Sequence, residues 1–255
     1  MKQKVACCFS LLLILAVTSP FSISFAQNVT IDWSNINQGY EHPSPEQIRM
    51  EQEKARLAEE YVKDKDQFFS GRPTVMINGS GQTRKVNLVG TFRQLKDYTC
   101  GPAAARNLIW GYVRTTGLGS VPNEAALAVE LHTTTAGTEF HTRWQTVLNR
   151  HAPGNAYQLR WGTATNWINE LRWRVLFTID RPNGYNVIGN INHGTTATPV
   201  HPVYANGAAH YLVIHGYNDV TREFYISDSY RGVPVQFRAP YVNTANSTQR
   251  RGIVW

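Results

Sequence analysis

The order of its secondary-structure patterns limits the fold of this chain more than any other feature. Helical periodicity predicts helices over about 102–113, 123–132, 140–151 and 166–177. Alternation predicts strands over about 84–92, 156–161, 185–191, 209–217 and 223–228. Helices thus come mostly first and strands mostly last, which is typical of α+β proteins rather than of alternating α/β proteins. We therefore expect an α+β fold with a helical N-terminal half and an antiparallel sheet in the C-terminal half.

The first 26 residues have the features of an export signal. Lys2 and Lys4 give a positive start, Val5 to Val17 form a short apolar run, and Ser24 and Ala26 place small residues before a cleavage point. The apolar run is shorter than a membrane-spanning helix. The sequence predicts a signal peptide over 1–26 and a secreted or extracytoplasmic protein at the cell surface, with an uncleaved anchor as the alternative.

Removal of residues 1–26 from the 255-residue chain leaves 229 residues, enough for one domain and a small extension. The extension is expected over 27–80. In it, Ser44 and Gln47 form the start signal of a charged, mostly exposed helix that reaches about residue 68. This helix is either a pro-segment over the active site, or an exposed spacer or a helix packed behind the domain. The domain itself is expected over 81–255.

The charge balance indicates which partners the chain binds. The net charge of +7 falls to +5 without Lys2 and Lys4, since residues 1–26 contain no other charged residue. Basic residues do not cluster except at Arg250 and Arg251, so no nucleic acid partner is expected. The positive charge suits an anionic cell wall or membrane surface, and equally an ordinary soluble protein. No second long apolar stretch follows, so no integral membrane segment is expected after signal removal.

The cysteine count directs attention to one residue. The chain has three cysteines, and Cys7 and Cys8 leave with the signal peptide. Cys100 then has no partner for an internal disulfide, and a free thiol in an exported protein is oxidisable. Cys100 is therefore either a reactive group or an inert buried side chain.

The neighbours of Cys100 favour the reactive alternative. Cys100 stands where a loop enters a predicted helix, Gly101 leaves space beside it, and Pro102 suits the first helical turn. The unpaired N–H groups and the dipole at the start of that helix favour a thiolate over a thiol. They also favour an oxyanion, toward which Gln94, six residues earlier, could direct an amide N–H.

Two predicted strands carry the groups that would activate the thiolate. His210 begins an apolar strand, and Asp228 ends the next one. If the turn between them is centred on Val220, Leu212 lies opposite Asp228, and His210 is a diagonal neighbour of Asp228 on the same face. A register change of one residue would separate them. In this register Asp228 would orient the imidazole as the third member of a triad does.

Strand parity selects one of the two histidines in the first strand. His215 lies five positions after His210, so in an unbroken strand the two side chains point to opposite faces. Only His210 shares a face with Asp228. His215 is therefore expected to be a packed or half-exposed strand residue.

These motifs resemble the papain-like cysteine peptidases of family thirty-nine, the bacteriocin leader peptidases and their stand-alone secreted relatives. The resemblance extends from about Lys85 to Tyr230 and is carried by three stretches: Gln94 with Cys-Gly-Pro-Ala-Ala at 100–104, Ala-His-Tyr-Leu-Val-Ile-His-Gly-Tyr at 209–217, and Tyr-Ile-Ser-Asp at 225–228. It implies a papain-like fold and a secreted cysteine peptidase that hydrolyses peptide bonds through an acyl-enzyme. It assigns Cys100 as nucleophile, His210 as base, Asp228 as orienting carboxylate and Gln94 to the oxyanion hole, with no cofactor.

The sequence departs from the family pattern in two ways. The family usually places proline after the aspartate, whereas Ser229 follows Asp228 here, which leaves Asp219 as an alternative carboxylate. The separation of 110 positions between residues 100 and 210 exceeds that of the transporter-linked leader peptidases, and no transporter domain follows. Both facts point to the stand-alone branch, with a peptide or protein substrate and an association with the cell wall.

Other functions remain as alternatives. A peptidoglycan amidase or a transglutaminase-like acyltransferase would use a similar group of residues, although the amidase would have a histidine as third residue. A papain-like binding module at the cell surface would keep the fold without the chemistry. A metal site is not expected, because the chain has no His-Glu-x-x-His helix. The remaining histidines are interpreted as surface or loop residues: His132, His141, His193 and His201.

Overall fold

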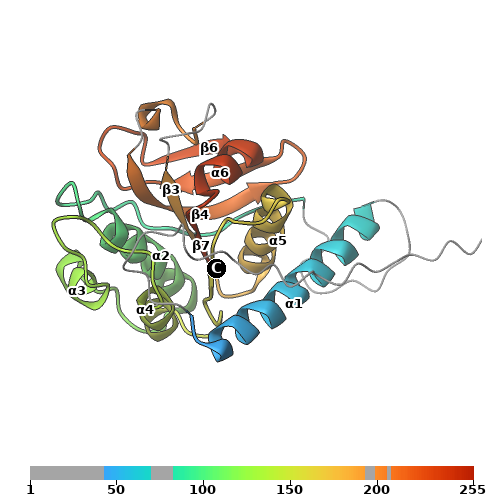
Figure 1. Ribbon diagram of the computed structural model, residues 1–255, viewed down its shortest axis with the longest axis horizontal. Helices are drawn as coiled ribbons and strands as arrows, with labels where there is room; N and C mark the ends of the chain where they lie inside the picture. Colours follow the sequence, from blue (N-terminus) through green and yellow to red (C-terminus); the bar gives the residue numbers. More distant parts are fainter. Residues whose placement is uncertain (1–42, 70–82, 193–198, 206–207) are drawn as a thin grey trace, which may run out of the picture. The chain divides into compact units, whose positions relative to one another are not determined.

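The computed structural model describes residues 43–69, 83–192, 199–205 and 208–255, all of which belong to one compact unit (Figure 1). The predicted signal peptide at 1–26 and the lead-in at 27–42 lie outside the described residues. Within the described residues, none of the helices combines the length and the apolar character that crossing a membrane requires.

The described chain contains six α-helices, one short 3-10 helix and seven strands. The helices are α1 (Pro45–Phe69), α2 (Cys100–Thr116), α3 (Glu124–Glu130), α4 (Arg143–His151), α5 (Trp167–Asp180), η2 (Pro202–Tyr204) and α6 (Tyr241–Thr248). The strands are β1 (Arg84–Val86), β2 (Leu159–Arg160), β3 (Val187–Asn192), β4 (Ala209–Asn218), β5 (Glu223–Ser227), β6 (Gln236–Pro240) and β7 (Gly252–Val254). Five α-helices, α1 to α5, precede β3, the first of the five strands that build most of the sheet, so the predicted α+β class is confirmed.

The strands form one antiparallel sheet in the order β2-β7-β3-β4-β5-β6, and β1 pairs with β4. Along one edge of β4, β3 pairs with residues 209–214 and β1 with residues 216–218. His215 lies where the partner strand changes, and its backbone carbonyl accepts from the N–H of Asn87 at 2.8 Å. Strand β4 is thus paired along its whole length, which fixes the position of His210 at its start.

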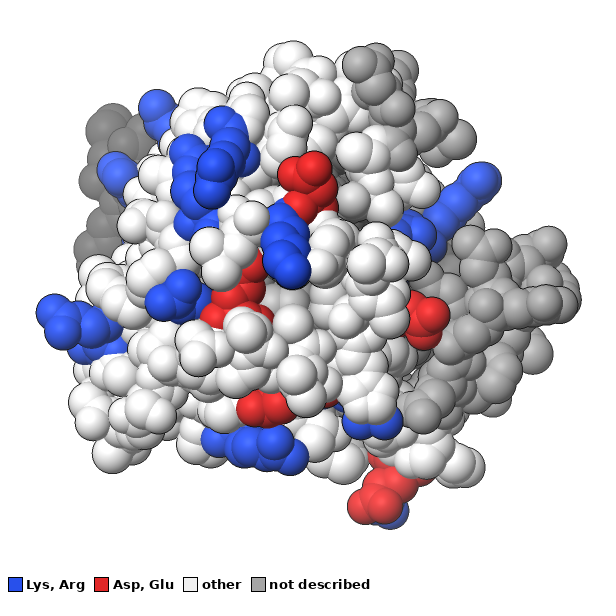
Figure 2. Space-filling model, turned by 90° about the vertical axis from the view of Figure 1, so that its left-hand side faces the viewer, with Lys and Arg blue, Asp and Glu red and all other residues white. Residues whose placement is uncertain are grey.

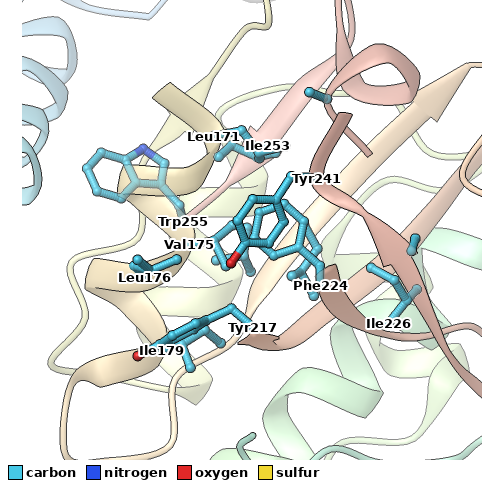
Figure 3. Close-up of a cluster of buried hydrophobic side chains, with 14 of the residues drawn as sticks. Leu171, Val175, Leu176, Ile179, Tyr217, Phe224, Ile226, Tyr241, Ile253 and Trp255 are labelled. Carbon is cyan, nitrogen blue, oxygen red and sulfur yellow. The ribbon is translucent and has the colours of Figure 1, made fainter. Parts of the chain in front are cut away.

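Helices cover the two faces of the sheet differently. Helix α2 packs against β3 and β4 on one face, and α5 and α6 pack on the other (Figure 1). The core between α5, α6 and the sheet is shown in Figure 3, where α5 side chains lie against aromatic side chains of β4, β5 and α6. Its fully buried members include Leu171, Val175, Tyr217, Phe224 and Ile253.

The N-terminal helix agrees with its predicted bounds but not with its predicted exposure. Ser44 and Gln47 form the reciprocal cap, with the Ser44 N–H donating to the Gln47 side chain at 2.7 Å and the Gln47 N–H donating to Ser44 Oγ at 3.2 Å. The helix was expected to be mostly exposed, and this is wrong for one of its faces, which packs on α5. The buried positions recur every three or four residues along this face: Glu51, Lys54, Ala58, Tyr61, Val62 and Lys65.

Charged side chains on that face of α1 are buried in pairs. Lys65, fully buried, donates to Asp180 Oδ2 at 2.7 Å and to the Tyr217 hydroxyl at 2.6 Å. Arg174 of α5 donates to Glu51 at 2.9 Å. The charges that suggested a solvated helix are therefore used partly inside the protein, where pairing offsets the cost of burial.

Candidate active site

Cys100 is the first residue of α2, and 7% of its surface is exposed. Thr99 precedes it without capping the helix, because its hydroxyl donates instead to the Lys96 carbonyl at 2.9 Å. Pro102 has no N–H to offer. The Ala103 N–H donates to the Thr99 carbonyl, whereas the Gly101 N–H is hydrogen-bonded to the Cys100 sulfur, which favours negative charge there.

The requirement for glycine beside Cys100 has a clear cause. A Cβ atom added at Gly101 would lie 2.4 Å from Thr138 Oγ1 and 2.7 Å from Thr138 Cβ. Thr138 belongs to the loop between α3 and α4, which is tied to β4 because the Tyr211 hydroxyl donates to the Thr138 carbonyl at 3.1 Å. Gly101 thus allows this loop to pack directly beside Cys100.

His210 lies in β4 and is 5% exposed. Its Nε2 lies 2.7 Å from Asp228 Oδ1, at hydrogen-bond distance. Asp228 follows the last residue of β5. The last pair of the β4–β5 ladder is Val213 opposite Ser227, the residue before Asp228, and this is the register that the hairpin argument assumed. At the hairpin tip, however, Asn218 pairs with Glu223, so the turn is not centred on Val220.

A β-bulge at His215 accounts for this difference. The register shifts by one residue between Ile214 and Gly216, so the pairing near the site differs from that at the tip. His215 itself is buried, and its Nδ1 lies 3.0 Å from the Asn87 carbonyl. It packs away from Asp228, in agreement with the interpretation of His215 as a strand residue.

The Asp228 carboxylate is fully buried and has three hydrogen-bond partners. Oδ1 accepts from His210 Nε2 at 2.7 Å and from the Tyr230 N–H at 2.8 Å, and Oδ2 accepts from the Tyr204 hydroxyl at 2.6 Å. The alternative carboxylate, Asp219, is bound instead to Arg172 at 2.7 Å near the hairpin tip. The geometry therefore places Asp228, not Asp219, beside the imidazole.

The electrostatics of the three groups favour an ion pair. Burial acts to raise the pKa of the Cys100 thiol. The hydrogen bond to His210 and the charge of His210, followed by hydrogen bonds from the backbone N–H groups of Tyr211 and Gly101, outweigh burial and lower the pKa below its ordinary value. Burial acts to lower the pKa of His210, but the charge and hydrogen bond of Asp228, and then Cys100, raise it. Since Nε2 faces Asp228, Nδ1 is the ring nitrogen left to face Cys100.

Asp228 stays ionised in this arrangement. Burial alone would raise its pKa, but the charge and hydrogen bond of His210, followed by the hydrogen bonds from Tyr204 and Tyr230, lower it below its ordinary value. The directions of these pKa shifts favour a thiolate and an imidazolium beside the Asp228 carboxylate, which is the charge state that a cysteine nucleophile needs.

Gln94 lies in the loop before α2 and is 5% exposed. Its amide donates to the carbonyls of Lys96 at 3.1 Å and Asp97 at 3.2 Å, and its Oε1 accepts from Ser229 Oγ at 3.2 Å. Both amide hydrogens are thus directed at the loop that leads to Cys100. Ser229, where the family usually has proline, links this loop to the end of β5.

Two residues that sequence reasoning did not identify complete the site. The ring of Tyr204 stacks on His210 with centroids 5.2 Å apart, and the ring of Tyr230 meets His210 edge-on at 6.2 Å. Tyr230 lies two residues after Asp228 and could have been noticed from that position. Tyr204 lies in a short 3-10 helix with no motif around it.

The remaining histidines lie apart from this cluster. His132 is exposed, His201 accepts from the Val203 N–H at 3.3 Å, and His141 is buried in its loop rather than exposed. His193 lies outside the described residues. In the described ranges, no group of three or more His, Cys, Asp or Glu side chains could hold a metal ion.

Comparison with known proteins identifies one family. Residues 86–247, more than half of the chain, match the Peptidase_C39 like family. No curated protein matches the chain. Among solved structures, the peptidase domain of Streptococcus ComA, a bifunctional ABC transporter involved in a quorum-sensing pathway, is similar at 16% identity and a TM-score of 0.38. That match covers 67% of this chain and 96% of the ComA domain.

Proposed function

The chain belongs to the Peptidase_C39 like family, which confirms the predicted resemblance, and on this premise we propose that it is an exported cysteine peptidase with Cys100 as nucleophile. The family and the fold support a cysteine peptidase in general terms. The assignment of Cys100, His210 and Asp228 to a triad is our proposal. One observation carries it: His210 is held by Asp228 through Nε2 and is hydrogen-bonded to Cys100 at the start of a helix.

The acylation step begins from the thiolate–imidazolium pair. Cys100 Sγ attacks the carbonyl carbon of a peptide bond, a C–S bond forms, and the carbonyl oxygen becomes an oxyanion. The N–H of Cys100 at the start of α2 would stabilise this charge. His210 then transfers its Nδ1 proton to the leaving nitrogen as the C–N bond breaks, which releases an amine and leaves a thioester.

The deacylation step returns the pair to its starting state. Neutral His210 takes a proton from water, the hydroxide attacks the thioester carbonyl, and the C–S bond breaks to give a carboxylic acid and the Cys100 thiolate. Asp228 stabilises the imidazolium in both steps and keeps Nε2 protonated. Gln94 takes part in the oxyanion hole only if its amide leaves the Lys96 and Asp97 carbonyls, so in the ground state its role is to hold the loop.

The carboxylate partner of His210 favours this function over the alternatives. A Cys-His-His amidase would have a histidine where Asp228 lies. A binding module has no need for a buried charged network around a free thiol, because such a network is costly unless all its members are paired. The proposed reaction needs no cofactor.

The proposed substrate is a peptide or protein outside the cell. On the face beside α3 and α4, Figure 2 shows Lys and Arg in several separate groups with Asp and Glu between them. Nucleic acid binding would call for a continuous basic surface. The predicted signal peptide supports export, and an association with the cell wall belongs to the same proposal.

The experiment that tests the proposal is alkylation of the mature protein by iodoacetamide between pH 4 and pH 9. Cys100 is the only thiol after residue 26, so the rate has one source, and Cys100→Ala is the blank. A thiolate–imidazolium pair gives a rate plateau well below the pKa of about 8.5 of a free thiol. His210→Ala should remove that plateau.

Other outcomes would change the conclusion. A rate that rises with the pKa of an ordinary thiol in the wild-type protein would overturn the cysteine nucleophile. A plateau without cleavage of any member of an unbiased peptide mixture would favour the binding module. Mass spectrometry of the secreted protein tests export, since cleavage of the predicted signal leaves Gln27 as the first residue.

A further inference from the structure

We propose that Tyr204 is a positioning residue of this site, which fixes the Asp228 carboxylate through its hydroxyl and the His210 imidazole through its ring. The inference rests on the proposed function, because a positioning role requires that Cys100 and His210 react. Tyr204 acts through Asp228 and His210, and it comes from the short 3-10 helix that precedes β4.

The hydroxyl contact is short and buried. Tyr204 Oη donates to Asp228 Oδ2 at 2.6 Å, while the other carboxylate oxygen accepts from His210 and from the Tyr230 N–H. Oδ1 is thus occupied by two donors, and the side chain that donates to Oδ2 is Tyr204. Without this donor a buried carboxylate oxygen would be left without a hydrogen bond, and the carboxylate could rotate away from His210.

The ring contact acts on the other member of the pair. The Tyr204 and His210 rings are 5.2 Å apart at 26°, a stacked arrangement, and Tyr230 meets His210 at 68° from another side. A ring between a stacked and an edge-on neighbour has little freedom about its side-chain torsions. The imidazole then keeps Nε2 toward Asp228 and Nδ1 toward Cys100.

Tyr204 is suited to remain a donor. Burial, followed by the charge of Asp228 and their hydrogen bond, raises the pKa of Tyr204 far above its ordinary value. The hydroxyl therefore stays protonated wherever Asp228 is ionised. The charged or titratable groups that face Asp228 are His210, Tyr204, and Arg93, whose guanidinium donates to the Asp228 backbone carbonyl at 3.4 Å.

The fold offers a matched tyrosine that lacks this role. Tyr241, 2% exposed, also donates its hydroxyl to a carboxylate, that of Asp219, at 3.0 Å. Asp219 is paired with Arg172 near the hairpin tip and not with His210. Tyr204→Phe and Tyr241→Phe each delete one buried hydroxyl from one aspartate, so they differ in which carboxylate is affected.

The test compares the pH dependence of Cys100 alkylation in Tyr204→Phe, Tyr241→Phe and the wild-type protein, each well below its melting temperature. Loss of the hydroxyl weakens the hold on ionised Asp228, so the acid limb of the Tyr204→Phe profile should move to higher pH. The rate at pH 6 should fall about tenfold, as expected when a hydrogen bond to a charged group is lost. Tyr241→Phe should lower stability without moving the profile.

A double-mutant cycle with Asp228→Asn separates a positioning role from a general one. If Tyr204 acts through Asp228, Tyr204→Phe should have no further effect on the profile once the carboxylate is gone. Should Tyr204→Phe not fold, all three profiles are recorded in sucrose, an osmolyte that favours the folded state, and the same shift is expected.

The outcomes distinguish failure of this inference from failure of the proposed function. A wild-type plateau that His210→Ala removes, together with a Tyr204→Phe profile that overlays the wild-type one, overturns the role of Tyr204 alone. A wild-type protein without a plateau overturns the function first. Equal shifts in Tyr204→Phe and Tyr241→Phe would assign the effect to lost stability and also overturn the inference.

Discussion

At the scale of single residues, the charge of Asp228 is the feature that distinguishes a triad from a pair of hydrogen-bonded side chains. Asp228→Asn keeps the size of the side chain and removes the charge that raises the pKa of His210. The thiolate at Cys100 then loses its imidazolium partner near neutral pH. We expect the alkylation rate at pH 6 to fall by about tenfold or more, since a shift of one pKa unit changes the ionised population by that factor.

Asp219→Asn provides the control for that measurement. Asp219 is partly buried, and it accepts hydrogen bonds from Arg172 and Tyr241 near the hairpin tip rather than from His210. Its loss should lower the melting temperature and leave the alkylation profile unchanged. Equal profiles for Asp228→Asn and the wild-type protein would contradict the assigned role of Asp228.

The same scale shows what sequence reasoning can and cannot find in a site. Cys100, His210 and Asp228 each stand in a local pattern, namely a helix start, a strand start and a strand end, so their proximity could be predicted. Tyr204 has no such pattern, because its role comes from a tertiary contact between a 3-10 helix and two strands. The catalytic roles of Cys100, His210, Asp228 and Gln94 stay predictions.

At the scale of elements, the β4–β5 hairpin has the predicted register near the site, although its bulge was not predicted. The prediction assumed an unbroken register about Val220, whereas the tip pairs Asn218 with Glu223. The bulge at His215 shifts the register by one residue, so Val213 lies opposite Ser227 near the site, as the assumed register requires. Alternation alone could not predict the bulge, because it arises where β4 changes partners from β3 to β1.

Helix α1 is held to the domain by buried charges, which bears on whether it is removed. We expect Lys65→Met to destabilise the protein by about 3 kcal/mol, because it leaves the Asp180 carboxylate buried without its cation. Urea unfolding measures the change. In the folded protein α1 should therefore remain attached, and the secreted chain should begin at Gln27 rather than beyond residue 70.

Lys63 offers a matched substitution on the same helix. Its ammonium lies 2.8 Å from Glu59, but both side chains are largely exposed, and exposed pairs add little. Lys63→Met should leave the unfolding midpoint unchanged. If the two substitutions had the same small effect, α1 would be a loosely attached segment, as a pro-segment over the active site would be.

At the scale of the whole molecule, the sequence predicted the α-helices and strands up to the β4–β5 hairpin and none of those after it. The predicted separation of helices and strands is confirmed, yet β6, α6 and β7 were not predicted. Strand β6 ends in Pro240, and α6 is composed of residues with low helix propensity, so neither has a strong local signal. Strand β7 exists because it pairs with both β2 and β3, a contact that no short window contains.

The whole fold should also report the charge state of its site through the pH dependence of its stability. In the proposed charge state, Cys100 and His210 share one proton in the folded protein, and the raised pKa of the imidazole and the lowered pKa of the thiol favour its place on the imidazole. In the unfolded chain between about pH 6.5 and pH 8.5, one proton also remains, on the thiol. The pair then contributes no slope to stability in this window, because folded and unfolded states bind equal numbers of protons.

Cys100→Ala should change this balance. The folded variant still holds a proton on His210, because Asp228 raises the pKa of His210, whereas the unfolded variant has none above about pH 6.5. A raised folded pKa gives stability that is lost as pH rises, so the free energy of unfolding should fall by up to about 1.4 kcal/mol per pH unit. Urea unfolding of both proteins from pH 6.5 to pH 8.5 gives the difference, in which all other groups cancel.

The direction of that difference reports whether His210 is charged in the variant. A gap between wild type and Cys100→Ala that widens with pH requires a protonated His210 in the folded Cys100→Ala protein, the state that the charge of Asp228 favours. A constant gap would mean that His210 is neutral in that protein, because both proteins would then bind as many protons folded as unfolded. The same comparison made in a His210→Ala background should give a constant gap, since no imidazole remains to hold the proton.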